Sequence, residues 1–433
     1  MKLSVENIIR CIWFISMITI VIVNKLFDEY LADDLAILVI LMSIYCLIRV
    51  KKNIFLSVIF IFILVFNYSI CSSWYIDILE NTMFTGFADE SVAKLGINIL
   101  FVFMGTISIF LPNKIYGTYK SDTLTTIKGI NIKTHCVIII ILVAILIFGF
   151  GRTEDFTQRG SPSTIYEYSI IIFIIGIYFT NKNKVTYIQI TYISLLILFA
   201  LQNMIWGGRV TALQLLIALA LLYFYNKKIK SLYLYLAFLF VPMVMIGVVR
   251  GLDNTYSIDM VSYVTKSLTD KAMAIDTAYS AYFTSMTFLK VADEISSLDR
   301  FIMFGKFIAS MIAGGTIVDG ANLAEFTRSY YFHYYGGVLP YFGWFYFGWM
   351  GVLLFAAIVS FYIKMINNVN LYSSDFYKCA ALYICCSIPR WYLYSPSNLI
   401  RGVLILYIIL VSIKRINRLL CPNKIVESID RRQ

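Results

Sequence analysis

Residues 54–71 read IFLSVIFIFILVFNYSIC, a run of eighteen residues without a single charged side chain. At about 1.5 Å per residue, a helix of this length spans about 27 Å, close to the apolar thickness of a bilayer. Because lipid offers no hydrogen-bonding partners, a backbone that crosses it must form a helix or a closed barrel. The run therefore predicts a membrane-spanning helix.

Similar apolar runs recur along the whole chain of 433 residues, of which 60% are hydrophobic and only 14% are charged. A soluble domain averages about 45–50% apolar and about 25% charged residues. A water-soluble globule of the present composition would have too few polar side chains to cover its surface. The composition excludes soluble enzymes and disordered scaffolds, and it indicates an all-α polytopic membrane protein.

Apolar runs between charged residues predict about twelve transmembrane helices. They lie near residues 8–23, 35–48, 54–71, 93–112, 135–150, 166–180, 185–205, 210–225, 231–249, 341–363, 376–390 and 396–413. No small-residue cleavage signature follows the first run, so we expect a retained helix there and not a signal peptide. Twelve crossings would place both termini on the same side of the membrane.

The chain is thereby divided into four parts. Residues 1–249 hold the first nine expected helices, and residues 250–340 form a large loop. The last three expected helices occupy residues 341–413, and a basic tail follows at 414–433. We interpret the long loop as functional, because long ordered loops in compact proteins commonly carry function.

Two stretches of the large loop have an amphipathic pattern, so we expect the loop to be partly helical. The first lies around residues 260–290 and the second at 299–313. The second has the pattern of an interfacial or re-entrant helix, and Gly314-Gly315 is a stop signal at its end.

The distribution of charge predicts the orientation of the chain. The inner segments are assigned as 1–10, 49–53, 113–134, 181–184, 226–230, 364–378 and 414–433. They hold 22 basic and 5 acidic residues, whereas the rest of the chain holds 14 basic and 20 acidic residues. Because basic residues collect on the cytoplasmic side, both termini should be cytoplasmic and the large loop extracytoplasmic. The net charge of +11 thus reports orientation, and we expect no nucleic-acid partner.

Arginine is enriched on the predicted outer face, where 8 of the 14 basic residues are Arg, against 6 of 22 inside. The planar guanidinium suits bidentate contact with phosphate or carboxylate. We therefore expect the chemistry on the outer face.

Two arginines adjoin glycines at predicted outer helix ends. Arg209 closes Trp206-Gly207-Gly208-Arg209 at the start of a helix, where glycines admit a ligand and the helix N-terminus favours anions. Arg250, in Val249-Arg250-Gly251, begins the large loop with the same chemistry. The alternative is that both contact lipid headgroups as interfacial anchors.

The hairpin between the last two expected helices, residues 388–401, supplies two more arginines. Pro396 suits the first turn of the final helix, which places Arg401 about 7.5 Å along its axis. An arginine at that depth is costly unless it faces a polar cavity or an anion, although snorkelling to the interface is an alternative. Arg390, in the same hairpin, is the companion of Arg401.

The end of the large loop contains the candidate bases. His333 is the one histidine on the predicted outer side, and an imidazole titrates near neutral pH. Glu325 and Arg328 would share a face if their segment is helical, either as a site or as a local salt bridge. The alternative for His333 is an aromatic-belt anchor among its Tyr and Phe neighbours.

We expect no metal and no cofactor. The chain holds eight cysteines and two histidines, and no cysteine pair has zinc-ligand spacing with histidine.

These features together resemble the O-antigen polymerase (Wzy) family, whose members polymerise oligosaccharide repeat units. The shared features are the many helices, the large outer loop before the last three, the Gly-Gly-Arg corner, the Ile-Pro-Arg to Leu-Ile-Arg hairpin, and the segment Gly343 to Gly351 after the loop. The resemblance implies a GT-C-like helical bundle in which Arg209, Arg250, Arg390 and Arg401 line an outward-facing site. His333, Glu325 and Arg328 are added from the residues themselves, as catalytic groups and as a substrate contact.

The resemblance implies a glycosyltransferase in a bacterial inner membrane, with its active site facing the periplasm. A growing glycan would pass from undecaprenyl diphosphate to the non-reducing end of an incoming lipid-linked repeat unit, and a chain-length regulator is a candidate partner. An O-antigen ligase is the nearer alternative. A flippase or secondary transporter is the other, although transporters usually place charges at mid-helix, and here polar residues gather at the outer ends.

Overall fold

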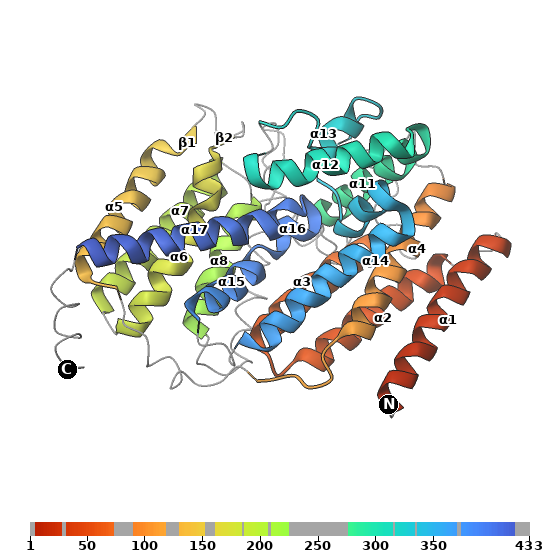
Figure 1. The fold of residues 1–433 in the computed structure, drawn as a ribbon, viewed down its shortest axis with the longest axis horizontal. Helices are drawn as coiled ribbons and strands as arrows, with labels where there is room; N and C mark the ends of the chain where they lie inside the picture. Colours follow the sequence, from red (N-terminus) through yellow and green to blue (C-terminus); the bar gives the residue numbers. More distant parts are fainter. Residues whose placement is uncertain are drawn as a thin grey trace, which may run out of the picture. The chain divides into compact units, whose positions relative to one another are not determined.

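The structure, a computed structural model, describes residues 5–27, 32–72, 90–117, 130–151, 161–183, 186–206, 209–224, 276–314, 317–333, 336–369 and 374–420. Within these ranges nearly all residues are helical, as Figure 1 shows. The strands are two short segments, β1 (Phe150–Gly151) and β2 (Ser161–Pro162), which pair antiparallel. The predicted all-α fold is confirmed.

The chain divides into two compact units, and each is described by itself. The first comprises Met1–Gly117, Ser257–Asn368 and Ile388–Asn398, and the second Thr118–Tyr256, Val369–Ser387 and Leu399–Gln433. The described helices of the first unit are α1 (Val5–Phe27), α2 (Ala32–Val50), α3 (Ile54–Cys71), α4 (Glu90–Phe110), α11 (Asp276–Glu294), α12 (Ser297–Ala313), α13 (Leu323–Arg328), α14 (Leu339–Asn367) and α16 (Ile388–Leu393). Those of the second unit are α5 (Ile132–Phe148), α6 (Thr164–Asn183), α7 (Thr186–Trp206), α8 (Arg209–Phe224), α15 (Asp375–Cys386) and, from Leu399 onward, α17 (Ser397–Leu419).

Each segment expected to cross the membrane overlaps at least one helix, apart from 231–249, which lies outside the described residues. In the described part of the chain, four helices are long and apolar enough to span a bilayer: Ile54–Cys71, Ser91–Phe110, Thr186–Met204 and Leu339–Asn367. Shorter apolar helices cover Arg10–Val23, Ile132–Phe148, Thr164–Thr180 and Val210–Leu222. The chain is therefore an all-α membrane protein.

Apolar side chains also cover outward faces, as expected of helices that contact lipid. On α1, Ile12 and Ile15 are 58% and 63% exposed, and on α5 Ile140 is 66% exposed. An exposed apolar stripe of this kind would be costly in water and marks a membrane-contacting surface.

The structure changes the expected segment 376–390, which is two helices and not one. Residues Asp375–Cys386 form α15, and the helix ends at the C-cap Ser387, whose backbone adopts φ −85° and ψ 5°. Its hydroxyl donates to the Tyr383 carbonyl at 2.7 Å, an alternative to regular helix bonding that serine readily provides. Residues Ile388–Leu393 then form the separate α16.

The expected helix 341–363 is part of α14, which contains a sharp kink. Phe347 and Gly348 have non-helical backbones, and Gly348 has φ 57° and ψ −140°, a region that is essentially restricted to glycine. The kink divides α14 into two limbs, one before Phe347 and one after Gly348. The limbs approach so closely that a Cβ placed on Gly351 would lie 1.9 Å from the Gly343 carbonyl oxygen. Gly348-Trp349-Met350-Gly351 thus opens the long second limb.

The amphipathic stretch predicted at 299–313 is helix α12, and its end at Gly314, which has φ 106°, is also confirmed. Met303, Phe307 and Met311 are buried at helical spacing, whereas Phe301 and Ile312 are 60% and 81% exposed. Rings from α12 pack on the kink of α14, with Phe304 and Phe347 centroids 4.7 Å apart. The exposed apolar face suits an interfacial helix, and its contact with a bilayer remains a prediction.

In the second unit, an ion pair whose carboxylate is buried fixes the start of α15. The Asp375 carboxylate is 1% exposed, accepts a hydrogen bond from the Tyr178 hydroxyl at 3.0 Å and pairs with Lys414 Nζ at 2.9 Å. Nearby, the Asn417 side chain accepts hydrogen bonds from the start of α5, from Asn131 N at 2.7 Å and Thr134 Oγ1 at 3.0 Å. These bonds attach α17 to α15 and to the start of α5, and they attach α15 to α6.

Candidate functional site

In the first unit, the end of the large loop crosses the terminal hairpin at two glycines. The Gly337 amide donates to the Leu393 carbonyl at 2.9 Å. Gly336 has φ 123°, and a Cβ on Gly337 would lie 2.5 Å from the ring of Phe288 on α11. Both positions therefore require glycine, the first for its backbone conformation and the second for space. The crossing holds together two segments that were predicted separately to carry site residues.

His333, three residues before this crossing, is completely buried. Its Nε2 atom lies 3.0 Å from Thr327 Oγ1, and the Thr287 hydroxyl is 3.4 Å from the same oxygen. The Thr327 hydroxyl also lies 3.1 Å from the Leu323 carbonyl, so its one proton can go to that carbonyl or to the imidazole. The imidazole is enclosed between α11 and α13, and it is not displayed on an open surface.

Glu325 and Arg328 lie on α13, so the helix that the sequence interpretation required is present. Glu325 is exposed, and Arg328 is half-buried. The Arg328 guanidinium lies over the ring of Phe332, with 5.3 Å between its central carbon and the ring centroid. This cation–π contact holds the guanidinium at the C-terminal end of α13, the helix that also carries Glu325.

Arg390 is carried by α16, a short helix whose other five residues are all buried. The Arg390 side chain is half-buried, and its carbonyl accepts hydrogen bonds from Tyr394 N at 2.9 Å and Ser395 N at 3.0 Å. These bonds turn the chain sharply before Pro396, which precedes α17. The turn thus fixes the backbone position of Arg390 at the end of the hairpin.

The hairpin is anchored by a buried polar chain that the apolar pattern did not predict. The Tyr392 hydroxyl donates to Asn67 Oδ1 at 2.6 Å, and Asn67 Nδ2 donates to Ser43 Oγ at 3.0 Å. The Tyr392 ring stacks on Phe66, with centroids 6.0 Å apart. Polar side chains within apolar runs, such as Asn67, were the available signal, because such groups need partners inside a membrane.

We expect Tyr392→Phe to loosen this anchor. The change would leave the Asn67 oxygen buried without its donor, which costs about 1–3 kcal/mol of folding free energy. Thermal unfolding of the purified protein in detergent would measure the loss, with Tyr407→Phe, at a residue 55% exposed, as the control. Equal stability of the two variants would contradict the anchoring role.

Arg401 belongs to the second unit, as the fifth residue of α17. It is half-buried, and its guanidinium carbon lies 5.3 Å from the centroid of the Tyr168 ring on α6. The next residue, Gly402, packs directly on Tyr383 of α15, where a Cβ would lie 1.8 Å from the hydroxyl oxygen. Arg401 thus stands on a closely packed helix beside an aromatic face.

Arg209 begins α8, as predicted, although its side chain and the preceding Gly207-Gly208 lie outside the described residues. Arg250 also lies outside them. The first unit therefore brings together the segments of Glu325, Arg328, His333 and Arg390, whereas Arg209 and Arg401 belong to the second unit. A single cluster of all the arginines stays a prediction.

One polar cluster near the site was missed by the sequence interpretation. The Tyr331 hydroxyl donates to the Glu294 carboxylate, and Lys290 Nζ lies 5.0 Å from the centroid of the Tyr331 ring. The hydrogen bond to Glu294 raises the pKa of Tyr331, and burial and the negative charge of Glu294 act in the same direction. Lys290 and Glu294 are four residues apart on α11, a spacing that places them on one helix face and could have revealed the pair.

The described residues include no group of three or more His, Cys, Asp or Glu side chains that could hold a metal ion. No protein-family model, no curated protein and no solved structure matches the chain.

Proposed function

We propose that the chain is an integral membrane glycosyltransferase that polymerises lipid-linked oligosaccharide repeat units, as in the O-antigen polymerase family that it resembles. The observation that carries the proposal is the crossing of Gly337 and Leu393, because it joins the end of the large loop to the arginine-bearing hairpin. Twelve crossings, cytoplasmic termini and a site on the outer face of a bacterial inner membrane belong to the same proposal.

In the reaction, the growing glycan leaves undecaprenyl diphosphate and joins the non-reducing end of an incoming lipid-linked unit. An acceptor hydroxyl attacks the anomeric carbon, the bond from that carbon to the diphosphate oxygen breaks, and the hydroxyl proton passes to a base. Negative charge grows on the departing diphosphate, and guanidinium groups already fixed beside it would lower the barrier. Arg328 and Arg390 are the first-unit candidates, and Arg209, Arg250 and Arg401 are the others.

The two candidate bases have different surroundings. Glu325 is exposed on α13 and can meet a substrate hydroxyl directly. His333 is buried, and its imidazole is hydrogen-bonded to Thr327, which also belongs to α13. A general base must come within hydrogen-bonding reach of the proton that it removes. The geometry therefore favours Glu325 as the base and His333 as the residue that positions α13.

A ligase would use the same donor chemistry and differ in its acceptor, which would be a lipid A core. A flippase or secondary transporter is less well supported, because transporters usually carry charges inside their spans. The apolar helices α3 and α7 contain no charged residue. The candidate arginines Arg328, Arg390 and Arg401 lie on α13, on α16 and in the first turns of α17, outside those two helices.

Deletion of the gene in the encoding bacterium tests the proposal. Loss of polymer with one repeat unit still attached to the lipid core would support a polymerase. Loss of all attached glycan would indicate a ligase, and failure of repeat units to reach the outer face would indicate a flippase. Unchanged surface glycan would reject all three assignments.

A further inference from the structure

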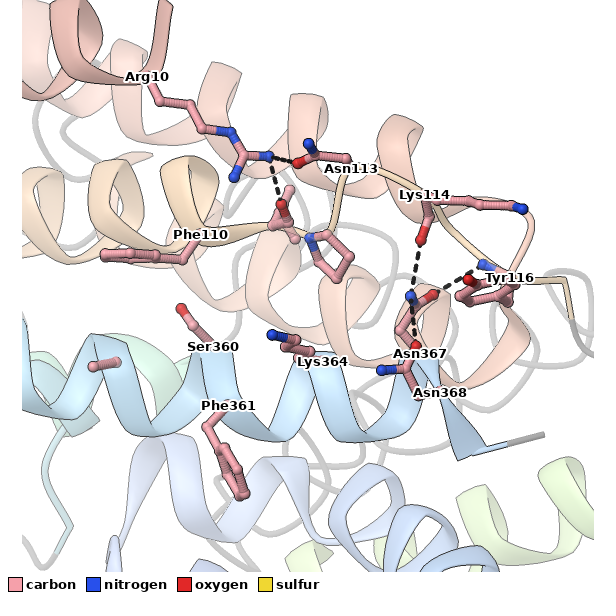
Figure 2. Close-up of a pocket in the computed structure, with 13 residues that line it drawn as sticks. Arg10, Phe110, Asn113, Lys114, Tyr116, Ser360, Phe361, Lys364, Asn367 and Asn368 are labelled. Atoms are coloured by element: carbon pink, nitrogen blue, oxygen red, sulfur yellow. Dashed lines mark hydrogen bonds between the residues drawn. The ribbon is translucent and has the colours of Figure 1, made fainter. Parts of the chain in front are cut away.

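A polar pocket lies in the first unit, and none of the candidate site residues described above lines it. A cavity of about 470 Å³ opens between α1, the segment that follows α4 and the last turns of α14, as Figure 2 shows. Three of its lining residues are basic, namely Arg10, Lys114 and Lys364, and none is acidic. The proposed glycosyl transfer makes no use of this pocket.

The walls of the pocket are fixed by hydrogen bonds of the protein itself. The Asn367 side chain, 2% exposed, accepts from Tyr116 N at 3.0 Å and donates to the Lys114 carbonyl at 2.9 Å. Arg10 donates to the Leu111 carbonyl at 2.9 Å and to Asn113 Oδ1, bonds drawn in Figure 2. The segment 111–116 is thus attached to both α14 and α1. A ligand would meet a preformed site and would not have to order it.

The balance of charge in the pocket favours an anion. Lys114 and Lys364 are exposed, and Arg10 is half-buried. The C-terminal ends of α4 and α14 also lie here, and each contributes about half a negative charge. Three cations against two helix ends leave about +2, enough to balance the single negative charge of a phosphodiester. Lys364 also stabilises the last turn of its own helix, but Lys114 follows α4 in an exposed turn and has no such role.

The rim of the pocket is apolar. Phe110 and Phe361 line it and are 55% and 65% exposed, on two helices that are long enough to cross a bilayer. A ligand that fills the site therefore needs an anionic head and an apolar tail. In the orientation that the charge distribution predicts, this end of the helices faces the cytoplasmic leaflet, where anionic lipids attract basic residues.

We propose that this pocket binds the phosphate headgroup of an anionic phospholipid, with the acyl chains lying along Phe110 and Phe361. Free phosphate would satisfy the same cations, but it would leave both rings uncovered. The ligand is thus defined by a phosphate headgroup of net negative charge joined to hydrocarbon.

The test uses the full-length protein in detergent and measures bound phosphatidylglycerol by native mass spectrometry, with phosphatidylcholine as the zwitterionic comparison. We expect Lys114→Gln combined with Lys364→Gln to weaken phosphatidylglycerol binding by about 30-fold, from about 1 kcal/mol for each basic residue near the headgroups. Lys306→Gln, an exposed lysine on α12 that does not line the pocket, is the matched control and should bind as the wild type does. Equal binding by the double variant and the control would overturn the proposal.

Two further measurements separate the sources of phosphate and do not depend on the variants. Inorganic phosphate at equal concentration should fail to displace the lipid, and displacement would show that the pocket recognises phosphate alone. A phosphatidylglycerol with a photoreactive acyl chain should label residues 110–116 and 357–368 of the wild-type protein. Labelling confined to other segments would overturn the lipid assignment.

Discussion

Replacing Arg390 or Arg401 with alanine is expected to abolish long glycan chains while the protein still accumulates in the membrane. Removing one group that stabilises developing negative charge typically costs about 10²–10³-fold in rate. Because a polymer grows by repeated transfers, a loss of that size at each step would leave short products. We expect Arg209→Ala to behave in the same way. Chain length would be read from gels of surface glycan, and protein amount from membrane fractions.

A matched control distinguishes catalysis from a general effect of charge. Arg415 lies on the same helix as Arg401, near the other end, and is exposed. Arg415→Ala should leave chain length unchanged. Arg401→Lys keeps the charge but loses the planar fork, so it should restore chain length only in part. Normal chains in both Arg390→Ala and Arg401→Ala would remove these residues from the site.

The cation–π contact of Arg401 gives a rival explanation that can also be measured. Loss of the contact with Tyr168 would destabilise the protein modestly, because such pairs contribute about 0.5–2 kcal/mol. Tyr168→Leu removes the ring and keeps the arginine. If that variant also loses long chains at normal protein levels, the aromatic face is part of the substrate site.

The positions of the helices could be predicted from the sequence because the signal is strong and local. A run such as 54–71 has no charge, and in a membrane its backbone can be satisfied only within the segment or in a closed barrel. The amphipathic helix at 299–313 could be predicted equally well, since its buried residues recur at helical spacing. By contrast, the helix carrying Glu325 and Arg328 was only a condition of the sequence interpretation, and the structure shows that it is present.

The contacts that build the site could not be predicted, because they join residues distant in sequence. The bond from Gly337 to Leu393 and the bond from Tyr392 to Asn67 link segments with no shared pattern. The burial of His333 follows from the packing of α11 and α13 around it and not from its neighbours along the chain. The sequence around a histidine flanked by aromatic residues does not distinguish a buried imidazole from one exposed at the membrane interface.

The kink in α14 was hidden for a different reason. Residues 339–367 form one apolar run, and hydrophobicity alone cannot distinguish a straight helix from a bent one. The glycines at 343, 348 and 351 are the physical cause, since the first and third permit close approach of the two limbs and the second permits the left-handed backbone. Glycine in the interior of an apolar run was the signal available.

Gly351→Ala should be among the most destabilising single substitutions in the chain. A Cβ there would lie 1.9 Å from the oxygen and 2.5 Å from the carbon of the Gly343 carbonyl, and backbone atoms cannot turn aside as a flexible side chain can. Relief requires the two limbs of α14 to separate, which breaks the packing of Phe347 on Phe304. Overpacking of a core costs about 1–3 kcal/mol even where side chains can adjust, so we expect a loss of at least about 3 kcal/mol.

Gly305→Ala, on α12, is the appropriate comparison for this substitution, because a Cβ at Gly305 meets no atom within 4 Å. Alanine is favoured over glycine inside a helix by about 0.5–1 kcal/mol, so this variant should be slightly more stable than the wild type. Thermal unfolding in detergent, followed by the fluorescence of Trp344 and Trp349 beside the kink, would separate the two outcomes. If both variants unfold at or above the wild-type temperature, the limbs of α14 do not approach each other as described, and a straight helix would account better for residues 339–367.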